Sequence, residues 1–511
     1  MSTATLILMV FVLYFGLIIG LAIRFRKSKN LSDYYLGGRS LNTWVGALSA
    51  QTSDMSGWLL MGLPGAIYAA GTGRAWIAVG LIAGTAINWI FVAKRLRRYT
   101  IVANNSVTLP EYLENRFHDR SHVLKVTAAI FFAIFFTVYA ASGFVAGGTL
   151  LPQIFDINYH VAVISLAAFV VLYTFIGGLK AISWTDSIQG MMMLLAVMIL
   201  PVIVIATMGG WSAVNAGIPP GFFNIMTDGA GDPIALRSII SDVAWGLGYF
   251  GMPHILIKLI AIGKEKFVSR SAIIAIVWVV LALGSAVMVG LVGRAFMPGL
   301  ENPETVFISM VRTIFIDHGS LWMVLVGGLF MCGMFAAIKS TADSQLLVGS
   351  SAVADMYRVA KKKASDTHMV WFSRAAVLAV ALVAVWIALS AYCPEIGGPD
   401  RSTGVMVLVA MAWAGFGSAF GPLVLTSVFW KRTNLPGAIA GVIVGGVTVI
   451  LWQYIPLAGG ETLGATTGIF SLVPGFFLSL ATIFAVSLAT KPPSAEILKE
   501  FEKASQPNPE V

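Results

Sequence analysis

The chain has 511 residues, of which 58% are apolar and only 11% are charged. Because a soluble globular domain has about 25% charged residues, this composition excludes an ordinary soluble protein and indicates that most of the chain lies in lipid. A net charge of +9 would suggest nucleic-acid binding in a soluble protein, but here basic loops between apolar segments account for it, and no nucleic-acid partner is expected.

Apolar segments long enough to cross a bilayer, about 20 residues each, recur from end to end. They predict an all-α polytopic membrane protein with thirteen transmembrane helices, in a transmembrane domain of residues 1–490 followed by a polar tail of residues 491–511. The first segment lacks a basic leader and a cleavage site, so we expect a retained helix there. The predicted helices span residues 4–24, 41–65, 74–97, 123–149, 160–177, 187–209, 233–261, 271–296, 319–356, 369–391, 404–430, 435–455 and 467–489.

The distribution of lysine and arginine predicts the orientation of these helices. With the N-terminus outside, about 27 basic residues fall in cytoplasmic segments and about five outside, which leaves only Lys339 in the middle of a helix. The C-terminal tail is then cytoplasmic. The most basic loops are residues 24–30, 94–98, 264–270 and 358–363.

The second and seventh segments contain residues that interrupt helices. Ser49 to Gly65 reads SAQTSDMSGWLLMGLPG, and Ala244 to Ile255 reads AWGLGYFGMPHI. Such residues free backbone groups, which the membrane tolerates only where protein or a water-filled site satisfies them. Paired interruptions therefore indicate a central binding site in a transporter built from inverted repeats. The alternative is that small residues only let helices pack closely.

Several motifs make the chain similar to a known family. It resembles the solute:sodium symporter family, and within it the sodium/proline symporters, over nearly its whole length. The motifs that carry the resemblance are LGGRSL at 36–41, SDMSGWLLMGLPGA at 53–66, YTFIGGLKAISWTD at 173–186, AWGLGYFG at 244–251, STADSQLLVGSSAVADMY at 340–357 and WAGFGSAFGP at 413–422.

The resemblance implies a LeuT-like core in which helices 2–6 and 7–11 are inverted repeats. It also implies a carrier of the inner or plasma membrane that couples sodium entry to the uptake of L-proline by alternating access. No cofactor is expected, and sodium is the coupling ion. Such coupling requires that each ligand discriminate between the conformations of the carrier.

The family's sodium site carries over to five positions of this chain, which would supply backbone carbonyls and hydroxyls as oxygen ligands for a hard cation. The carbonyls are those of Thr52, Met55 and Ala337, and the hydroxyls are those of Ser340 and Thr341. By the same resemblance Asp54 lies beside the cation path, and Asp186 lies on the sodium exit route at the cytoplasmic end of helix five. An alternative for Asp186 is a helix N-cap.

The family's proline pocket also carries over. It implies Ser56, Gly57, Trp58, Tyr139, Trp245, Tyr249 and Pro253 as substrate-binding residues. Aromatic rings offer flat apolar area to a pyrrolidine ring, and hydroxyl and indole groups can orient its carboxylate. Simple packing is the alternative for Tyr139. Met252 stands where related proline carriers have a polar residue, which leaves other small amino acids or carboxylates open as substrates.

Lys339 departs from the family pattern, because its position beside the proposed sodium ligands is usually apolar. A buried ammonium could replace the ion and make the carrier sodium-independent or proton-coupled. Helical geometry favours another role, because Lys339 points about 150° away from the ligand positions and about 40° from Asp343, one turn on. We therefore expect an ion pair between Lys339 and Asp343.

Other functional classes fit the sequence less well. A membrane sensor built on a transporter-like core is the alternative from another class, but no kinase-like domain follows Lys491. An enzyme is not expected, because the six histidines are scattered and neither an HExxH nor a GxSxG arrangement occurs. A P-loop, which would support a primary pump, is also missing from the sequence.

Overall fold

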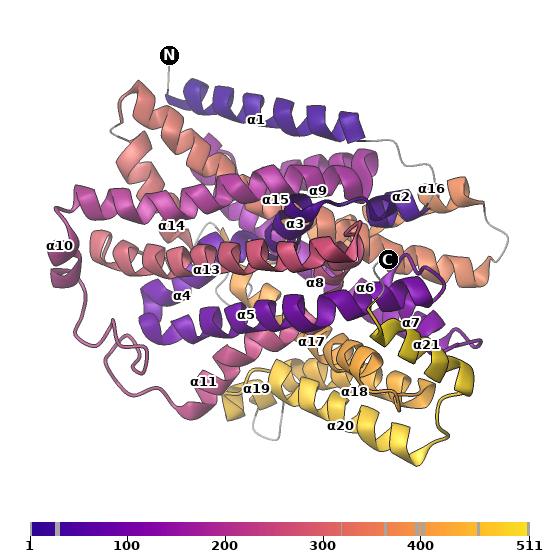
Figure 1. The fold of residues 1–511 in the computed structure, drawn as a ribbon. Coiled ribbons are helices and arrows are strands. Elements are labelled where there is room, and N and C mark those ends of the chain that lie inside the picture. The colour runs from indigo at the N-terminus through magenta and orange to yellow at the C-terminus, as the bar shows by residue number, and fades with distance from the viewer. Residues whose placement is uncertain are drawn as a thin grey trace.

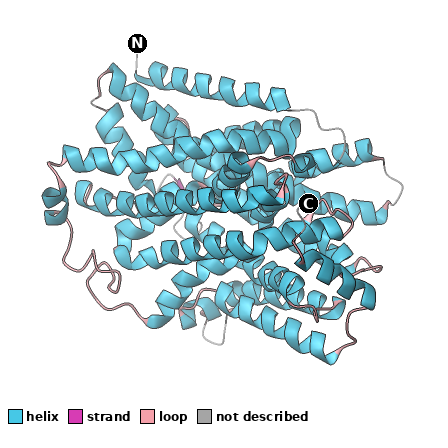
Figure 2. Ribbon diagram, viewed as in Figure 1, coloured by secondary structure: helices cyan, strands magenta, loops and turns pink. Residues whose placement is uncertain are grey.

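The computed structural model describes residues 3–25, 31–317, 319–361, 365–393, 398–399, 404–456 and 460–507. This part of the chain is almost entirely helical (Figure 2). Within it, the two short strands β1 (Tyr392–Cys393) and β2 (Gly398–Pro399) pair antiparallel. The predicted all-α class is confirmed.

Long apolar helices form one bundle, in which most run along a common direction (Figure 1). Ten helical segments of the described residues are long and apolar enough to cross a membrane. Nine of these segments carry a single helix label each: α1 (Thr3–Phe25), α8 (Val123–Phe155), α9 (Tyr159–Thr207), α13 (Glu265–Phe296), α15 (Leu321–Ala360), α16 (Asp366–Ser390), α17 (Val405–Phe429), α18 (Leu435–Tyr454) and α20 (Leu472–Ala489). The remaining span, Thr72–Val102, joins η3 (Thr72–Ala75), α5 (Trp76–Ile87), η4 (Asn88–Val92) and α6 (Ala93–Val102).

Both predicted interruptions are present. Helix α3 (Thr43–Asp54) ends before Met55, and the chain resumes as η2 (Trp58–Gly62) and α4 (Leu63–Ala70). Helix α11 (Leu236–Val243) continues as the 3-10 helix η5 (Ala244–Phe250), and α12 (Pro253–Ile260) follows after a bend of 44°. The glycines of 244–251 and the proline that starts α12 account for this break, because neither residue type sustains an α-helix interior.

The predicted end of helix five at residue 177 agrees with the structure, but the predicted start of helix six at residue 187 is wrong. Residues 178–186 were expected outside these helices, but α9 is helical from Tyr159 to Thr207 apart from a break at Gly178, whose φ is 62° and ψ is −179°. Glycine is the residue that adopts this conformation without steric cost. The chain therefore changes direction at a single residue, and Asp186 lies inside the second half of α9 instead of at a helix start, which excludes the N-cap role.

Shorter helices cover the two ends of the bundle. At the end where α1 begins lie α10 (Trp211–Ala216), η6 (Pro303–Thr305), α14 (Val306–Val311), η7 (Arg312–Ile316) and α19 (Leu463–Thr467). At the other end lie α2 (Leu31–Leu36), η1 (Gly37–Arg39), α7 (Leu109–Arg116) and α21 (Ala495–Ser505). The basic loops 24–30 and 358–363 lie partly outside the described residues.

The distribution of apolar side chains fits a bundle surrounded by lipid. Helix α15 packs against α8 and α9, and its middle is fully buried. By contrast, large apolar side chains of the outer helices are exposed, among them Leu13 (72%), Trp322 (75%) and Trp386 (68%). So large an apolar surface would be unstable in water and is stable in a bilayer.

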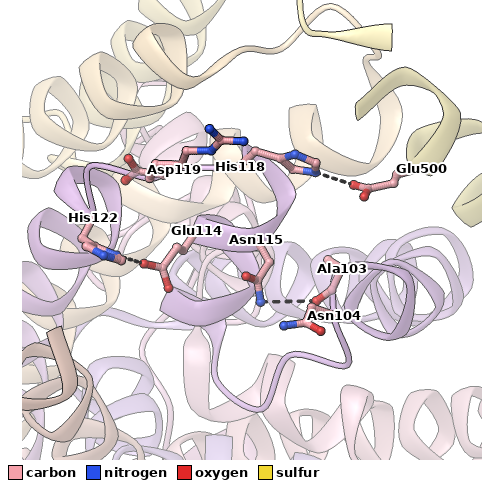
Figure 3. A pocket seen from close by; sticks show the side chains of 9 residues that line it. Ala103, Asn104, Glu114, Asn115, His118, Asp119, His122 and Glu500 are labelled. Atoms are coloured by element: carbon pink, nitrogen blue, oxygen red, sulfur yellow. Dashed lines mark hydrogen bonds and ion pairs between the residues drawn. The ribbon is translucent and has the colours of Figure 1, made fainter. Parts of the chain in front are cut away.

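The polar tail contains a docked helix. Helix α21 lies on α6 at the end of the bundle opposite the N-terminus (Figure 1), and the guanidinium of Arg116, the last residue of α7, lies over the ring of its Phe501. Phe501 packs edge-on against Tyr99, with ring centroids 6.1 Å apart, and Arg98 donates hydrogen bonds to the last carbonyls of α21. Beside it is a cavity of 490 Å³ in which His118 contacts Glu500 and His122 contacts Glu114 (Figure 3).

Candidate transport site

The proposed sodium ligands come together where the end of α3 meets the middle of α15. The hydroxyls of Ser340 and Thr341 both lie 3.3 Å from the carbonyl oxygen of Thr52, and the Ser340 hydroxyl lies 3.1 Å from the carbonyl oxygen of Ala337. All four residues are buried. The structure therefore places two hydroxyl and two carbonyl oxygens in one cluster, the donor types that a small hard cation prefers.

The break in α3 makes this cluster possible. Met55, the fifth proposed ligand residue, is the position at which α3 ends, with φ −81° and ψ 77°, and it is fully buried. The last carbonyls of a helix have no partner within the helix, so they can accept from side chains or bind a cation. The carbonyl of Thr52 accepts hydrogen bonds from two hydroxyls of α15 in this way.

Asp54 lies between the sodium ligands and the expected proline pocket. Its carboxylate accepts a hydrogen bond from the Tyr249 hydroxyl, and its carbonyl accepts one from the Trp58 indole nitrogen at 3.1 Å. Its other carboxylate oxygen has no hydrogen-bond partner within the described chain. The side chain is fully buried, so a negative charge there calls for a positive partner.

The expected pocket residues surround both interruptions, and all of them are buried. The Tyr139 ring meets His254 edge-on at 5.6 Å, and in the described part of the chain its hydroxyl has no partner. Such an unsatisfied hydroxyl is available to a ligand. Pro253 is the first residue of α12, the hydroxyl of Ser56 accepts from the Trp58 amide at 3.3 Å, and a Cβ on Gly57 would lie 2.9 Å from the Cβ of Ala146.

Trp245 closes one side of this region. Its ring stacks on Phe470 at 5.1 Å, and its carbonyl accepts from the Trp413 indole at 2.7 Å. A cavity of 370 Å³ reaches Trp245 from the end of the bundle where α1 begins, and the ion pair between Arg74 and Asp242, 3.0 Å long, lines it. Sequence reasoning did not select Trp413 or Phe470, because each lies in a different apolar segment.

Asp186 binds a lysine that sequence reasoning missed. The Lys258 ammonium lies 3.0 Å from an Asp186 carboxylate oxygen, and that oxygen also accepts from Ser49 at 3.0 Å and Ser53 at 3.1 Å. Lys258 and Asp186 are fully buried. Lys258 lies in the last turn of α12 and is as fully buried as Lys339, so the buried charge of the core is not confined to Lys339. The sequence did carry a signal for this lysine: Lys258 stands between the apolar stretches PHILI and LIAI, directly after the second interruption.

Lys339 and Asp343 form the second buried ion pair. The ammonium lies 2.5 Å from an Asp343 carboxylate oxygen and 3.3 Å from the centroid of the Tyr173 ring. Thr174 donates to the other Asp343 oxygen at 3.4 Å. Lys339 is therefore held on the face of α15 that meets α9, while Ser340 and Thr341 face α3.

Comparisons with known proteins agree with this arrangement. Residues 34–445 match the sodium:solute symporter family. The sequence is 42% identical to a sodium/proline symporter of Escherichia coli, over 99% of this chain and 97% of that protein. It is 41% identical to the high-affinity proline transporter PutP of Bacillus subtilis, over 93% of this chain and 96% of that protein.

Solved structures show the same fold. A Na+-coupled sialic acid symporter in a substrate-bound outward-open state superposes with a TM-score of 0.76 at 18% identity, covering 96% of this chain and 99% of that one. Mhp1, a nucleobase-cation-symport-1 transporter, superposes with a TM-score of 0.55 at 12% identity, covering 94% of this chain and all of that one. With a family match over most of its length, the chain belongs to the sodium:solute symporter family.

Proposed function

We propose that this protein couples the entry of sodium to the uptake of L-proline across the plasma membrane. The observation that carries the proposal is the position of Asp54, which follows the sodium ligand Thr52 by two residues and accepts from Tyr249 of the expected proline pocket. The high identity to sodium/proline symporters and a proline transporter supports L-proline as the substrate.

The charges of the core support sodium coupling. Three aspartates, Asp54, Asp186 and Asp343, are fully buried, and the last two each contact a lysine. No basic side chain contacts Asp54 within the described residues. Its charge is therefore left for a mobile cation or for the ammonium group of the substrate, and an intramembrane carboxylate without such a partner is costly. Sodium on the oxygen cluster of α3 and α15 would lie beside this carboxylate.

The proline pocket follows from the same breaks. Trp58, Tyr139 and Tyr249 would contact the ring and the carboxylate of proline, with Trp245 on the side of the cavity that leads outward. Ser56, Gly57 and Pro253 would place backbone groups of the broken helices near the substrate. Sodium would stabilise the conformation in which this pocket is formed, which is how binding at one site favours the other.

The membrane topology of the proposal has thirteen crossings. Ten spans become eleven with the bent pair α11–α12, twelve with α3–α4, and thirteen when α9 is divided at Gly178. Helices two to six and seven to eleven of this count would be the inverted repeats of a LeuT-like core, each beginning with a broken helix. The N-terminus would lie outside and the tail with α21 would lie in the cytoplasm.

Proton coupling through Lys339 is the second candidate, because a buried lysine lies one residue from Ser340. The ion pair with Asp343 and the contact with Tyr173 favour a structural role instead. If Lys339 is structural, replacing the pair together (Lys339→Met with Asp343→Asn) leaves uptake dependent on sodium. If uptake by this double variant no longer depends on the cation that drives it in the wild type, Lys339 takes part in coupling.

The deciding experiment measures uptake of radiolabelled L-proline into proteoliposomes under three conditions: an inward sodium gradient, an inward proton gradient without sodium, or no gradient. Accumulation with sodium alone supports the proposal. Accumulation with protons alone would favour proton coupling through Lys339. Accumulation of another small amino acid or carboxylate but not proline would refute the proposed substrate. Binding without accumulation under any gradient would favour a sensor.

A further inference from the structure

The ammonium group of Lys258 lies inside a small shell of oxygen atoms. Its nitrogen is 2.7 Å from the Ser49 hydroxyl, 3.0 Å from an Asp186 carboxylate oxygen and 3.4 Å from the Ser183 hydroxyl. These oxygens come from α3 and α9, while the lysine comes from α12. All four residues are fully buried.

This shell has the chemistry of a cation site. A carboxylate with several hydroxyls is the donor set that hard cations take in proteins. The second carboxylate oxygen of Asp186 is buried and has no hydrogen-bond partner within the described residues, so it is available as a ligand. A buried carboxylate in such surroundings is stable only with a positive charge beside it.

The shell is continuous with the proposed sodium ligands. Ser53, the residue after Thr52, donates to Asp186 at 3.1 Å and lies 3.0 Å from the hydroxyl of Ser344 on α15. The break in α3, the middle of α15 and the second half of α9 thus meet in one polar region. A positive charge on Lys258 therefore acts close to the sodium site.

We propose that Lys258 is a tethered cation: its ammonium group fills a second cation-binding position formed by Asp186, Ser49 and Ser183. The protein consequently moves a single sodium ion with each substrate molecule, the ion bound by the oxygen cluster of Thr52 and Ser340. Removing the tethered charge while keeping Asp186 opens the second position to sodium. This inference rests on the proposed sodium-coupled function.

The test compares the wild type with Lys258→Met, which keeps an unbranched side chain of nearly the same length and removes its charge. Radioactive sodium and proline fluxes are measured together in proteoliposomes. We expect the Lys258→Met variant to move one more sodium ion per proline than the wild type, and its uptake to rise sigmoidally with sodium concentration. An unchanged ratio with hyperbolic activation in this variant would overturn the inference.

Two matched variants control for the loss of the lysine itself. Lys258→Arg keeps the charge, and Lys258→Met combined with Asp186→Asn removes both charges of the pair. Both should keep the wild-type ratio, because neither presents an unpaired carboxylate. An extra sodium ion in the double variant would place the second site elsewhere and would also refute the inference.

A binding measurement covers the case in which Lys258→Met is inserted but inactive. Thermal unfolding in detergent is followed with and without sodium, since an ion that binds the folded state alone raises its melting temperature. The sodium-dependent shift should be larger in Lys258→Met than in the wild type and the double variant. Equal shifts overturn the inference. If the variant does not insert, a ratio above one sodium per proline in the wild type overturns it, and a ratio of one supports it. A wild type that accumulates no proline under a sodium gradient instead refutes the proposed function.

Discussion

The three buried aspartates beside the transport site differ in the groups that face them. Asp186 and Asp343 have lysine partners, whereas Asp54 accepts a hydrogen bond from the Tyr249 hydroxyl. The residue types alone do not distinguish them, because each is an isolated carboxylate in an apolar or small-residue segment. The distinction depends on which helix brings a lysine near, and of the three only Asp54 has no lysine contact within the described residues.

Replacing Tyr249 with phenylalanine tests the link between Asp54 and the substrate pocket. The hydrogen bond goes to a buried charged group, and its loss costs about 1.5–3 kcal/mol, or roughly 10- to 100-fold in affinity. We expect the Tyr249→Phe variant to raise the proline KM or the sodium requirement by about this factor. Tyr454→Phe, at an exposed tyrosine near the end of α18, is the control and should behave as wild type. Equal uptake kinetics in the two variants would contradict the prediction.

The elements of the core were predictable where the sequence carries a local signal. Serine, aspartate and glycine in the second segment, and glycine and proline in the seventh, indicate the two breaks directly. The break in α9 was predicted at the right place, but the start of helix six was placed too late because the residues from Leu179 to Asp186 include charged groups that resemble a loop. Lys258 was missed because its partner Asp186 is 72 residues away, and no local pattern reports such a pair.

The break in α9 depends on one glycine, which gives a prediction for this element. At φ 62° and ψ −179°, Gly178 adopts a conformation that costs an L-residue about 1–3 kcal/mol. We expect the Gly178→Ala variant to unfold at a lower temperature in detergent than the wild type. Gly16→Ala, in the regular part of α1 with nothing within 4 Å of the added Cβ, should unfold no lower than the wild type, because alanine favours a helix interior over glycine. Equal melting temperatures would mean that α9 does not need this backbone conformation.

The first turn of helix α17 donates hydrogen bonds to a carboxylate of another element. Glu304 of η6 accepts from the amides of Met406 at 3.1 Å and Val405 at 3.3 Å, at the first turn of α17. This contact fixes the loop that follows α13 to the start of α17. Burial raises the pKa of Glu304 above its ordinary value of 4.5, while the two amides oppose the shift. A raised pKa means that the protonated form is favoured by the fold.

The sign of the pH effect follows from that shift. The stability that Glu304 contributes is fully present below pH 4.5 and is lost as the pH rises through the raised pKa. Glu304→Gln keeps the shape and an acceptor but does not titrate. We expect the stability of the wild type relative to Glu304→Gln to fall as the pH rises across this window, measured by thermal unfolding in detergent. Glu502→Gln, on the exposed side of α21, should give no such difference. A difference that rises with pH would reverse the sign and refute the prediction.

At the scale of the whole molecule, the two ends of the bundle differ in what covers them. One end holds α10, α19 and the cavity that reaches Trp245, and the other holds α7 and the docked α21 (Figure 1). The overall fold and the family were predictable, because composition, repeated apolar segments and long motifs are properties of the sequence. The docking of α21 was not, because its apolar residues Ile497 and Phe501 are few and lie in a charged tail.

The orientation of these ends gives a last prediction. In a background with Cys332→Ala and Cys393→Ser, single cysteines are introduced at Ala230, in the exposed loop before α11, and at Glu502 of α21. Because basic loops are retained in the cytoplasm, we expect a membrane-impermeant maleimide to label Ala230→Cys on intact cells and Glu502→Cys only after permeabilisation. If Glu502→Cys is labelled on intact cells and Ala230→Cys only after permeabilisation, the bundle has the opposite orientation in the membrane. In that orientation the cavity at Trp245 would open to the cytoplasm. The end of the bundle that holds α21 would face the outside, and substrate would have to enter from there.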